Sequence, residues 1–315
     1  MERGVFSPWR HRWATATAGL TLVLIFVGGL VTSTGSALAV PDWPLSYGML
    51  MPPMIGGIFY EHGHRMVAAT VGLLTLVLAV WTAARETRRG VRRLAWAALA
   101  AVVLQGLLGG LTVLLLLPTS VSVAHACLAQ TFFCIVIALA YLTSREWLDA
   151  DRAAPTAGGL VPWALGATAV VYLQLLVGAV MRHIGAGLAI PDFPLAFGRL
   201  VPPLTSGPVL VHFAHRIGAL VVLVAVARLL VRARRARDPR LLRLAGALFG
   251  LVLLQISLGA ATVLTTKAVT PTTLHVATGA AILGGSWLMT LRAFRLRRPA
   301  PDVAAAPAGQ PVPQS

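Results

Sequence analysis

The sequence predicts an all-α integral membrane protein whose eight transmembrane helices form two tandem four-helix bundles. Of the 315 residues, 57% are hydrophobic and 11% are charged, whereas soluble domains contain roughly 25% charged residues. Apolar stretches of transmembrane length recur along the whole chain. The second half of the sequence also repeats the motifs of the first half in the same order.

Eight apolar stretches are long enough to span a bilayer. Each is expected to be a helix, because irregular backbone cannot face lipid. The predicted spans are 13–33, 61–83, 94–117, 121–143, 160–181, 210–231, 241–264 and 272–291. The first stretch is longer than the apolar core of a signal peptide and lacks a convincing cleavage site, so it is counted as a span.

An internal repeat relates the two halves of the chain. The clearest match is between Leu38–Leu45 (LAVPDWPL) and Leu188–Leu195 (LAIPDFPL), at an offset of 150 residues. Each repeat carries four spans, an even number, so both repeats enter the membrane in the same orientation. We therefore expect the two bundles to be related by a pseudo-twofold axis along the membrane normal.

The repeat also sets the predicted domains. Residues 1–143 are expected to form an N-terminal bundle and residues 160–298 a C-terminal bundle. A polar stretch with Pro and Gly, residues 144–159, links them on the cytoplasmic side. The tail, residues 299–315, is rich in Ala and Pro and is expected to be disordered.

Membrane topology explains the formal net charge of +16 better than nucleic-acid binding does. Arginines cluster before the first span, between spans two and three, after span four, between spans six and seven, and after span eight. The polar surface that a nucleic acid would need is nearly absent. The positive-inside rule places both termini in the cytoplasm of a multi-pass cell-membrane protein, with loops 34–60 and 182–209 outside.

Two polar clusters stand where outer loops turn into apolar spans: Glu61–Arg65 (EHGHR) and His212–Arg216 (HFAHR). Ionisable residues at membrane spans are energetically costly and indicate functional sites. His62 should point away from the helix face that its neighbours in the first cluster share, so it receives no role. The roles of His183 and His212 are likewise left open.

Four histidines follow the repeat: His64 and His125 in the first half, His215 and His275 in the second. His64 and His125 each lie in the first predicted turn of an inward-running span, so their imidazoles should lie at a similar depth in the membrane. His215 and His275 repeat this arrangement in the second half. Two facing imidazoles in a four-helix bundle suit axial ligation of a heme, whereas zinc needs three or four ligands. The alternative is that these are polar core residues bonding between helices.

Arg65 and Arg216 each follow a predicted ligand and could pair with heme propionates, or extend to the outer interface instead. Glu61 is replaced by His212 in the second cluster. Residues three apart share a helix face, so Glu61 should face the pocket of His64 as a proton donor or acceptor. The alternative is an acid that complements a helix N-terminus.

Together these residues resemble the heme A synthase family. The resemblance covers residues 13–292 and rests on the repeat and on four sets of residues: Glu61–Arg65, Pro41–Pro44 (PDWP), His125, and His215 with His275. Members of that family oxidise the C8 methyl group of heme o to the formyl group of heme a for terminal oxidases, with heme b as cofactor.

By this resemblance, His215 and His275 are axial ligands of heme b, and His64 and His125 are axial ligands of the substrate heme. Glu61 is then the catalytic residue beside the substrate heme. The resemblance also implies heme o synthase and terminal oxidase assembly as partners. One branch of the family carries a cysteine pair in the first outer loop. Residues 34–60 contain no cysteine, so the chain departs from that branch.

Two other functions are weighed. A diheme electron-transfer cytochrome would use the same histidines. Electron transfer alone, however, gives no reason for an acid in one of the two sites and not in the other. A transporter built on a parallel repeat would place polar residues near the bilayer midplane. Here the ionisable residues lie at the outer ends, and Gln105 and Gln255 are the main midspan polar groups. The sequence identifies no electron donor and leaves homo-oligomer formation open.

Overall fold

The computed structural model describes residues 5–148 and 159–297. Its long helices are α1 (Pro8–Ser33), α2 (Gly56–Arg85), α3 (Arg89–Leu114), α4 (Thr119–Leu142), α6 (Val161–His183), α7 (Gly207–Arg235), α8 (Pro239–Leu264) and α9 (Val269–Leu296). A short helix, α5 (Arg145–Leu148), follows α4, and a 3-10 turn, η2 (Ala186–Leu188), follows α6. The predicted tail and most of the predicted linker lie outside the described residues.

The eight long helices confirm the eight predicted spans and the all-α membrane fold class. Each contains an 18-residue stretch with a mean hydropathy between 1.3 and 2.1. Helices of 23 to 30 residues are long enough to cross a hydrocarbon core about 30 Å thick. Many of their large apolar side chains are exposed, as expected of helices that face lipid.

The starts of the helices on the outer side differ from the prediction. α2 begins at Gly56 instead of residue 61, and α7 begins at Gly207 instead of residue 210. The expectation that His64 and His125 lie in the first turn is therefore wrong, because both lie beyond it. The first outer loop covers the start of α2 closely enough that a methyl group on Gly57 would lie 2.8 Å from the Cβ of Ala39.

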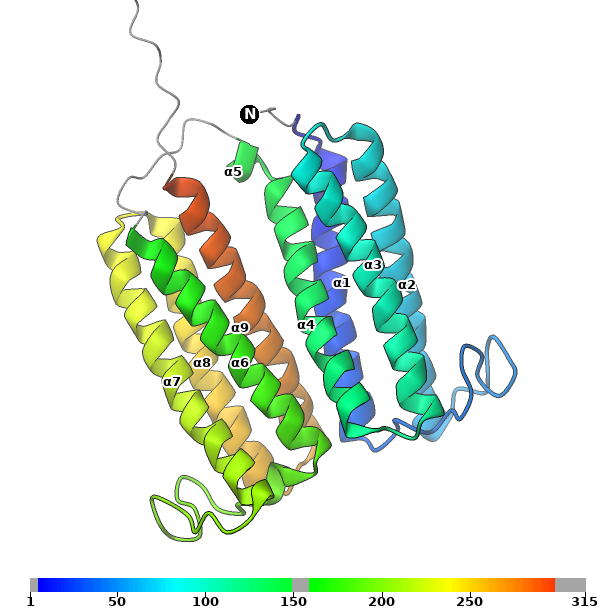
Figure 1. The fold of residues 1–315 in the computed structure, drawn as a ribbon, viewed down its shortest axis with the longest axis vertical. Helices are drawn as coiled ribbons and strands as arrows, with labels where there is room; N and C mark the ends of the chain where they lie inside the picture. Colours follow the sequence, from blue (N-terminus) through cyan, green and yellow to red (C-terminus); the bar gives the residue numbers. More distant parts are fainter. Residues whose placement is uncertain (1–4, 149–158, 298–315) are drawn as a thin grey trace, which may run out of the picture.

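The helices lie in two groups, with α1–α4 on one side and α6–α9 on the other (Figure 1). Within the first group α1 packs against α2 and α4, and α3 packs against α2 and α4. The second group has the same neighbours, with α6 against α7 and α9, and α8 against α7 and α9. The groups meet where α1 and α4 pack against α9 and where α4 packs against α6. Each group encloses its own apolar core.

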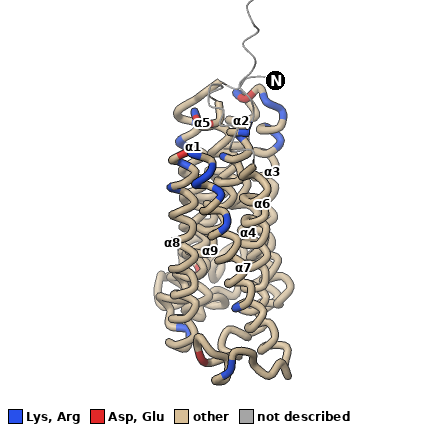
Figure 2. Tube along the Cα trace, turned by 90° about the vertical axis from the view of Figure 1, so that its left-hand side faces the viewer, with Lys and Arg blue, Asp and Glu red and all other residues tan. Residues whose placement is uncertain are grey.

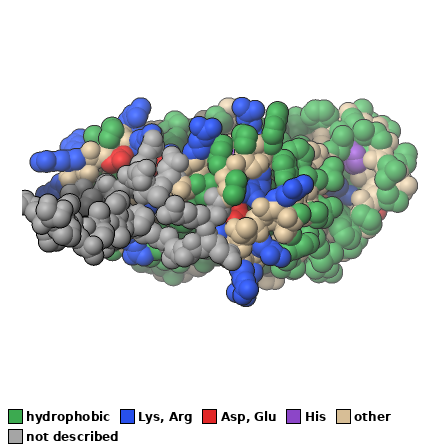
Figure 3. Space-filling view, turned by 90° about the horizontal axis from the view of Figure 1, so that it is seen from above, with side chains coloured by type: hydrophobic (Ala, Val, Ile, Leu, Met, Phe, Trp, Pro, Cys, Tyr) green, Lys and Arg blue, Asp and Glu red, His purple; other side chains and the backbone are tan. Residues whose placement is uncertain are grey.

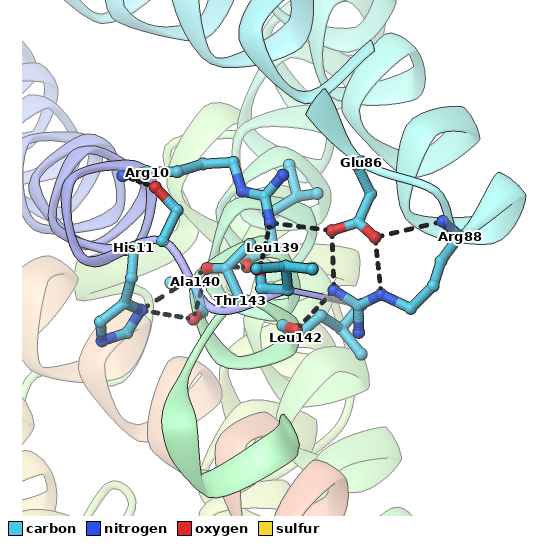
Figure 4. Close-up of polar contacts among 10 residues, drawn as sticks. Arg10, His11, Glu86, Arg88, Leu139, Ala140, Leu142 and Thr143 are labelled. Carbon is cyan, nitrogen blue, oxygen red and sulfur yellow. Dashed lines mark hydrogen bonds and ion pairs between the residues drawn. The ribbon is translucent and has the colours of Figure 1, made fainter. Parts of the chain in front are cut away.

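A buried ion cluster closes the N-terminal group at the end where the chain begins (Figure 4). The carboxylate of Glu86 accepts from Arg10 at 3.0 Å and from Arg88 at 2.9 Å, and Arg88 also donates to the carbonyl of Leu142. Burial opposes ionisation of Glu86, but the hydrogen bonds and charges of Arg88 and Arg10 outweigh it and lower its pKa. The cluster thereby joins α1, the turn after α2, and α4.

Each outer loop is folded around one aspartate. The carboxylate of Asp42 accepts from the backbone N–H groups of Tyr47 and Gly48 at 2.6 and 2.8 Å. In the second loop Asp192 accepts from the N–H groups at 197 and 198, both at 2.8 Å. These hydrogen bonds hold a tight turn in which Gly48 has a φ of +69°, a value that glycine adopts readily.

Candidate functional site

Each of the four repeat histidines lies against a glycine of a neighbouring helix. A methyl group on that glycine would lie 3.0 to 3.1 Å from the ring Cε1 atom, which is closer than ordinary van der Waals contact. The four pairs are Gly28 with His64, Gly109 with His125, Gly178 with His215, and Gly259 with His275. The glycines also repeat at an offset of 150 residues, so one packing arrangement places all four rings.

The second pair has the geometry of two axial ligands. The ring centroids of His215 and His275 lie 6.4 Å apart, with an angle of 61° between the ring planes. Nδ1 of His275 contacts the main-chain oxygen of Gln255 at 3.1 Å, and Nε2 lies 3.2 Å from the side-chain nitrogen of the same residue. When Nδ1 carries the proton, Nε2 holds the lone pair that a metal would take in place of the Gln255 amide. The donor set therefore fits a heme, whose porphyrin supplies the remaining ligands of the iron.

The first pair is formed by His64 of α2 and His125 of α4. The amide nitrogen of Gln105 lies 3.3 Å from Nε2 of His125 and donates to the His125 carbonyl at 3.0 Å. Nδ1 of both histidines is buried without a hydrogen-bond partner in the described part of the chain. Neither half groups three or more His, Cys, Asp or Glu residues in the way a protein-only metal site requires, within the described ranges.

Glu61 is buried and holds the first outer loop. One carboxylate oxygen accepts from the backbone N–H of Val40 at 2.8 Å, and the other accepts from Arg65 at 2.7 Å. In the second half, Nδ1 of His212 accepts from the N–H of Ile190, the residue equivalent to Val40, at 3.2 Å. Glu61 and His212 therefore make the same loop contact, and only Glu61 adds an ion pair.

Arg65 and Arg216 are engaged mainly by loop carbonyls. Arg65 donates to the carbonyl oxygens of Asp42 and Leu45, each at 2.8 Å. Arg216 donates to the carbonyl oxygens of Asp192 and Leu195 at 2.7 and 2.8 Å. Each guanidinium thus holds its outer loop onto the helix that carries a predicted ligand, and contact with a propionate stays a prediction.

Comparison with known proteins points to one family. The model of the cytochrome oxidase assembly protein family matches residues 55–286, which include Glu61 and all four repeat histidines. A heme A synthase of Symbiobacterium thermophilum is 37% identical over 78% of this chain and 82% of its own length. Heme A synthases of Caulobacter vibrioides and Geobacillus kaustophilus are 31% and 28% identical, over 91% and 96% of this chain and 96% and 97% of their own lengths.

The chain belongs to the heme A synthase family of cytochrome oxidase assembly proteins.

Two contacts in this family member were not predicted from the sequence. Nδ1 of His62, a residue given no role, lies 2.8 Å from the hydroxyl of Ser46 in the first outer loop. The equivalent residues in the second half are Phe213 and Ala196, so an apolar pair replaces the polar one. In the second contact, the side-chain nitrogen of Gln174 donates to the carbonyl of His215 at 2.7 Å, and Leu24 stands at the equivalent position in the first half. A position-by-position comparison of the two repeats would have marked both differences.

Proposed function

We propose that this protein oxidises the C8 methyl group of heme o to a formyl group and so produces heme a. Family membership supports a role in heme A biosynthesis, and the relatives named above are heme A synthases. The observation that carries the proposal is the duplicated histidine pair, with every ring placed by its own glycine and an acid in only one of the two sites.

In this proposal the two pairs have different tasks. His215 and His275 hold heme b, which supplies electron transfer when bound. His64 and His125 hold heme o as the substrate. Oxidation of a methyl group through an alcohol and a hydrated aldehyde releases protons as well as electrons, so a proton acceptor beside the substrate is required.

Glu61 is the proposed proton acceptor. Its carboxylate is buried, paired with Arg65 at 2.7 Å and hydrogen-bonded by the Val40 N–H, so a cation and a donor already lie beside the group that would take the proton. Proton uptake by Glu61 would weaken its ion pair with Arg65, whose remaining donors stay bound to loop carbonyls. The loop would therefore keep its place while Glu61 changes its charge.

The proposed setting is the cell membrane, with both termini in the cytoplasm and the histidine sites toward the outer face. A heme o synthase supplies the substrate and terminal oxidase assembly uses the product. The arginine-rich ends of the helices support this orientation. Figure 2 shows Arg positions gathered toward the end where the N-terminus lies, and Figure 3 shows Arg side chains projecting at that end.

The substitution Glu61→His tests the proposal, because it installs the residue that the second half carries at this position. Cells that make heme o and express the wild-type protein should accumulate heme a. The Glu61→His protein should bind as much heme b as the wild type while its heme a falls to the background level. Heme o that is never converted by the wild-type protein would refute the proposed reaction.

An electron-transfer cytochrome with two bis-histidine hemes is the second candidate. It is favoured by the observation that Glu61 and His212 make the same contact with the outer loops. In such a protein Glu61 would be a structural residue only. Glu61→His would then preserve electron transfer between donor and acceptor dyes, and the wild type would leave the heme side chains unchanged.

A further inference from the structure

Arg182 is a cation without an acidic partner, in the last turn of α6 before the second outer loop. Its Nη2 donates to the carbonyl of Gly29 at 3.2 Å and to the hydroxyl of Ser33 at 3.3 Å, both on α1. Among the described residues, its Nη1 and Nε have no hydrogen-bond acceptor and no carboxylate forms an ion pair with it. A partly buried guanidinium of this kind is costly unless an anion lies beside its free N–H groups.

The contacts of Gly29 place Arg182 beside the helix that carries His275. A methyl group on Gly29 would lie 3.4 Å from Val276 and 3.7 Å from Thr273, so this glycine packs against the first turns of α9. The charge of Arg182 also acts on the imidazole of His275. Thr273 is 2% exposed, and its hydroxyl has no hydrogen-bond partner in the described part of the chain. A cation and an unpaired buried hydroxyl therefore both lie against Gly29, near the second histidine pair.

The equivalent positions of the first half carry neither group. Thr32 stands where Arg182 stands in the second half, and Val123 stands where Thr273 stands, both at the offset of 150 residues that relates the repeats. The first exchange removes a positive charge and the second removes a hydroxyl. This pair of donors therefore distinguishes the half that carries the second histidine pair.

We propose that Arg182, together with the hydroxyl of Thr273, binds a propionate carboxylate of the heme held by His215 and His275. A heme carries two propionates, and a guanidinium forms strong charge-assisted hydrogen bonds with a carboxylate. Both Nη atoms of Arg216 already donate to loop carbonyls, whereas Nη1 and Nε of Arg182 are free within the described residues. The inference rests on the assignment of heme b to the C-terminal pair made above.

The test compares heme b with its dimethyl ester, in which both propionates are neutral, as ligands of the purified full-length protein in detergent. The protein carries His64→Ala and His125→Ala, so that the second pair is the remaining bis-histidine site. Binding is followed at the Soret band. We expect heme b to bind roughly 10–100-fold more tightly than the ester, the effect of a hydrogen bond to a charged group. Equal affinity for the two ligands would overturn the proposal without the need for any variant at Arg182.

Exchange for the first-half residues shows which donors cause the preference. Arg182→Thr should weaken binding of heme b and leave binding of the ester unchanged, and Thr273→Val should do the same to a smaller extent, because a neutral donor contributes less. Arg199→Met is the matched control: it removes an exposed cation of the second outer loop by installing the residue found at Met49, and it should keep the full preference. An unchanged preference in Arg182→Thr, or equal weakening of both ligands, would overturn the proposal.

A free carboxylate is the other source of the same chemistry. If Arg182 binds such an anion instead, acetate should protect the heme-loaded protein against thermal unfolding, Arg182→Thr should abolish this protection, and heme b and its ester should bind alike. That result would overturn the assignment to a propionate. A protein that binds neither heme b nor the ester would instead refute the proposed function, so the two failures are distinguishable.

Discussion

Four glycines determine where the four histidine rings lie. Gly28 and Gly178 occupy equivalent positions on α1 and α6, and a side chain at either one would reach the ring of the facing histidine. Each histidine ring fits closely against its glycine because small residues let neighbouring helices in membranes approach one another. The position of each ring therefore depends on the glycine that faces it.

The variant Gly178→Ala tests this dependence. The added methyl group would lie 3.0 Å from Cε1 of His215, so the ring must shift before it can bind a metal. We expect heme b binding to weaken by about 1–3 kcal/mol, the usual range for overpacking. Binding is measured by heme titration followed at the Soret band. Gly166→Ala on the same helix has open space and should leave heme binding unchanged.

At this scale the sequence predicted candidate site residues but not the contacts that hold their side chains. His64, His125, His215 and His275 were found because they repeat along the chain. The hydrogen bond from the Val40 N–H to Glu61 was not predicted, because a side chain that binds a loop backbone leaves no periodic pattern in the sequence. The placement of each ring by a glycine likewise depends on helix contacts that only the structure shows.

The outer loops are the elements that differ most from the sequence-based expectation. The apolar stretches located the eight long helices of the described residues, but they placed the start of α2 at residue 61. The helix begins at Gly56, and the loop folds back against its first turn, where a methyl group on Gly57 would lie 2.8 Å from the Cβ of Ala39. Loop contacts of this kind involve the backbone, and hydropathy does not report them.

Asp42 makes the first loop sensitive to acid. Hydrogen bonds from Gly48 and Tyr47 lower the pKa of its carboxyl below the ordinary value of 3.8. A lowered pKa means that the folded loop favours the ionised form. The stabilisation is therefore fully present above pH 3.8 and is lost as the pH falls through the lower pKa of the folded protein.

Asp42→Asn should weaken the turn at neutral pH, because one of the two accepting oxygens becomes an amide nitrogen. Hydrogen exchange at the Gly48 amide, corrected for intrinsic rates, should be faster in the variant at pH 7. In the wild type the corrected protection should fall only below pH 3.8. Asp192→Asn serves as the control, since it should affect the second loop alone. Equal protection of Gly48 in all three proteins would show that the carboxylate does not hold the turn.

At the scale of the whole molecule, the two helix groups differ mainly in their polar contacts. The first group has the Arg10–Glu86 ion pair at the end where the chain begins, with side chains only 2% and 0% exposed. The residues equivalent to Arg10 and Glu86 in the second half are Leu160 and, at an offset of 151, Arg237. Removing one partner of this buried pair would leave the other charge uncompensated and destabilise the protein by about 3–5 kcal/mol.

The orientation of the repeat gives a prediction for the molecule as a whole. A parallel repeat places both outer loops on the same side of the membrane, whereas an inverted repeat would place them on opposite sides. Leu50 and Leu200, one in each outer loop, are both 85% exposed and make suitable labelling positions. Arg92, at the start of α3, is exposed at the opposite end of the helices.

Single cysteines at these three positions, in a background with Cys127 and Cys134 changed to serine, can be labelled with a membrane-impermeant maleimide. In intact spheroplasts Leu50→Cys and Leu200→Cys should react, because the positive-inside rule puts both loops outside. Arg92→Cys should react only after the membrane is permeabilised. Labelling of just one of the two loop cysteines would contradict a parallel repeat, and labelling of Arg92→Cys alone in intact cells would reverse the orientation, placing the histidine sites toward the cytoplasm.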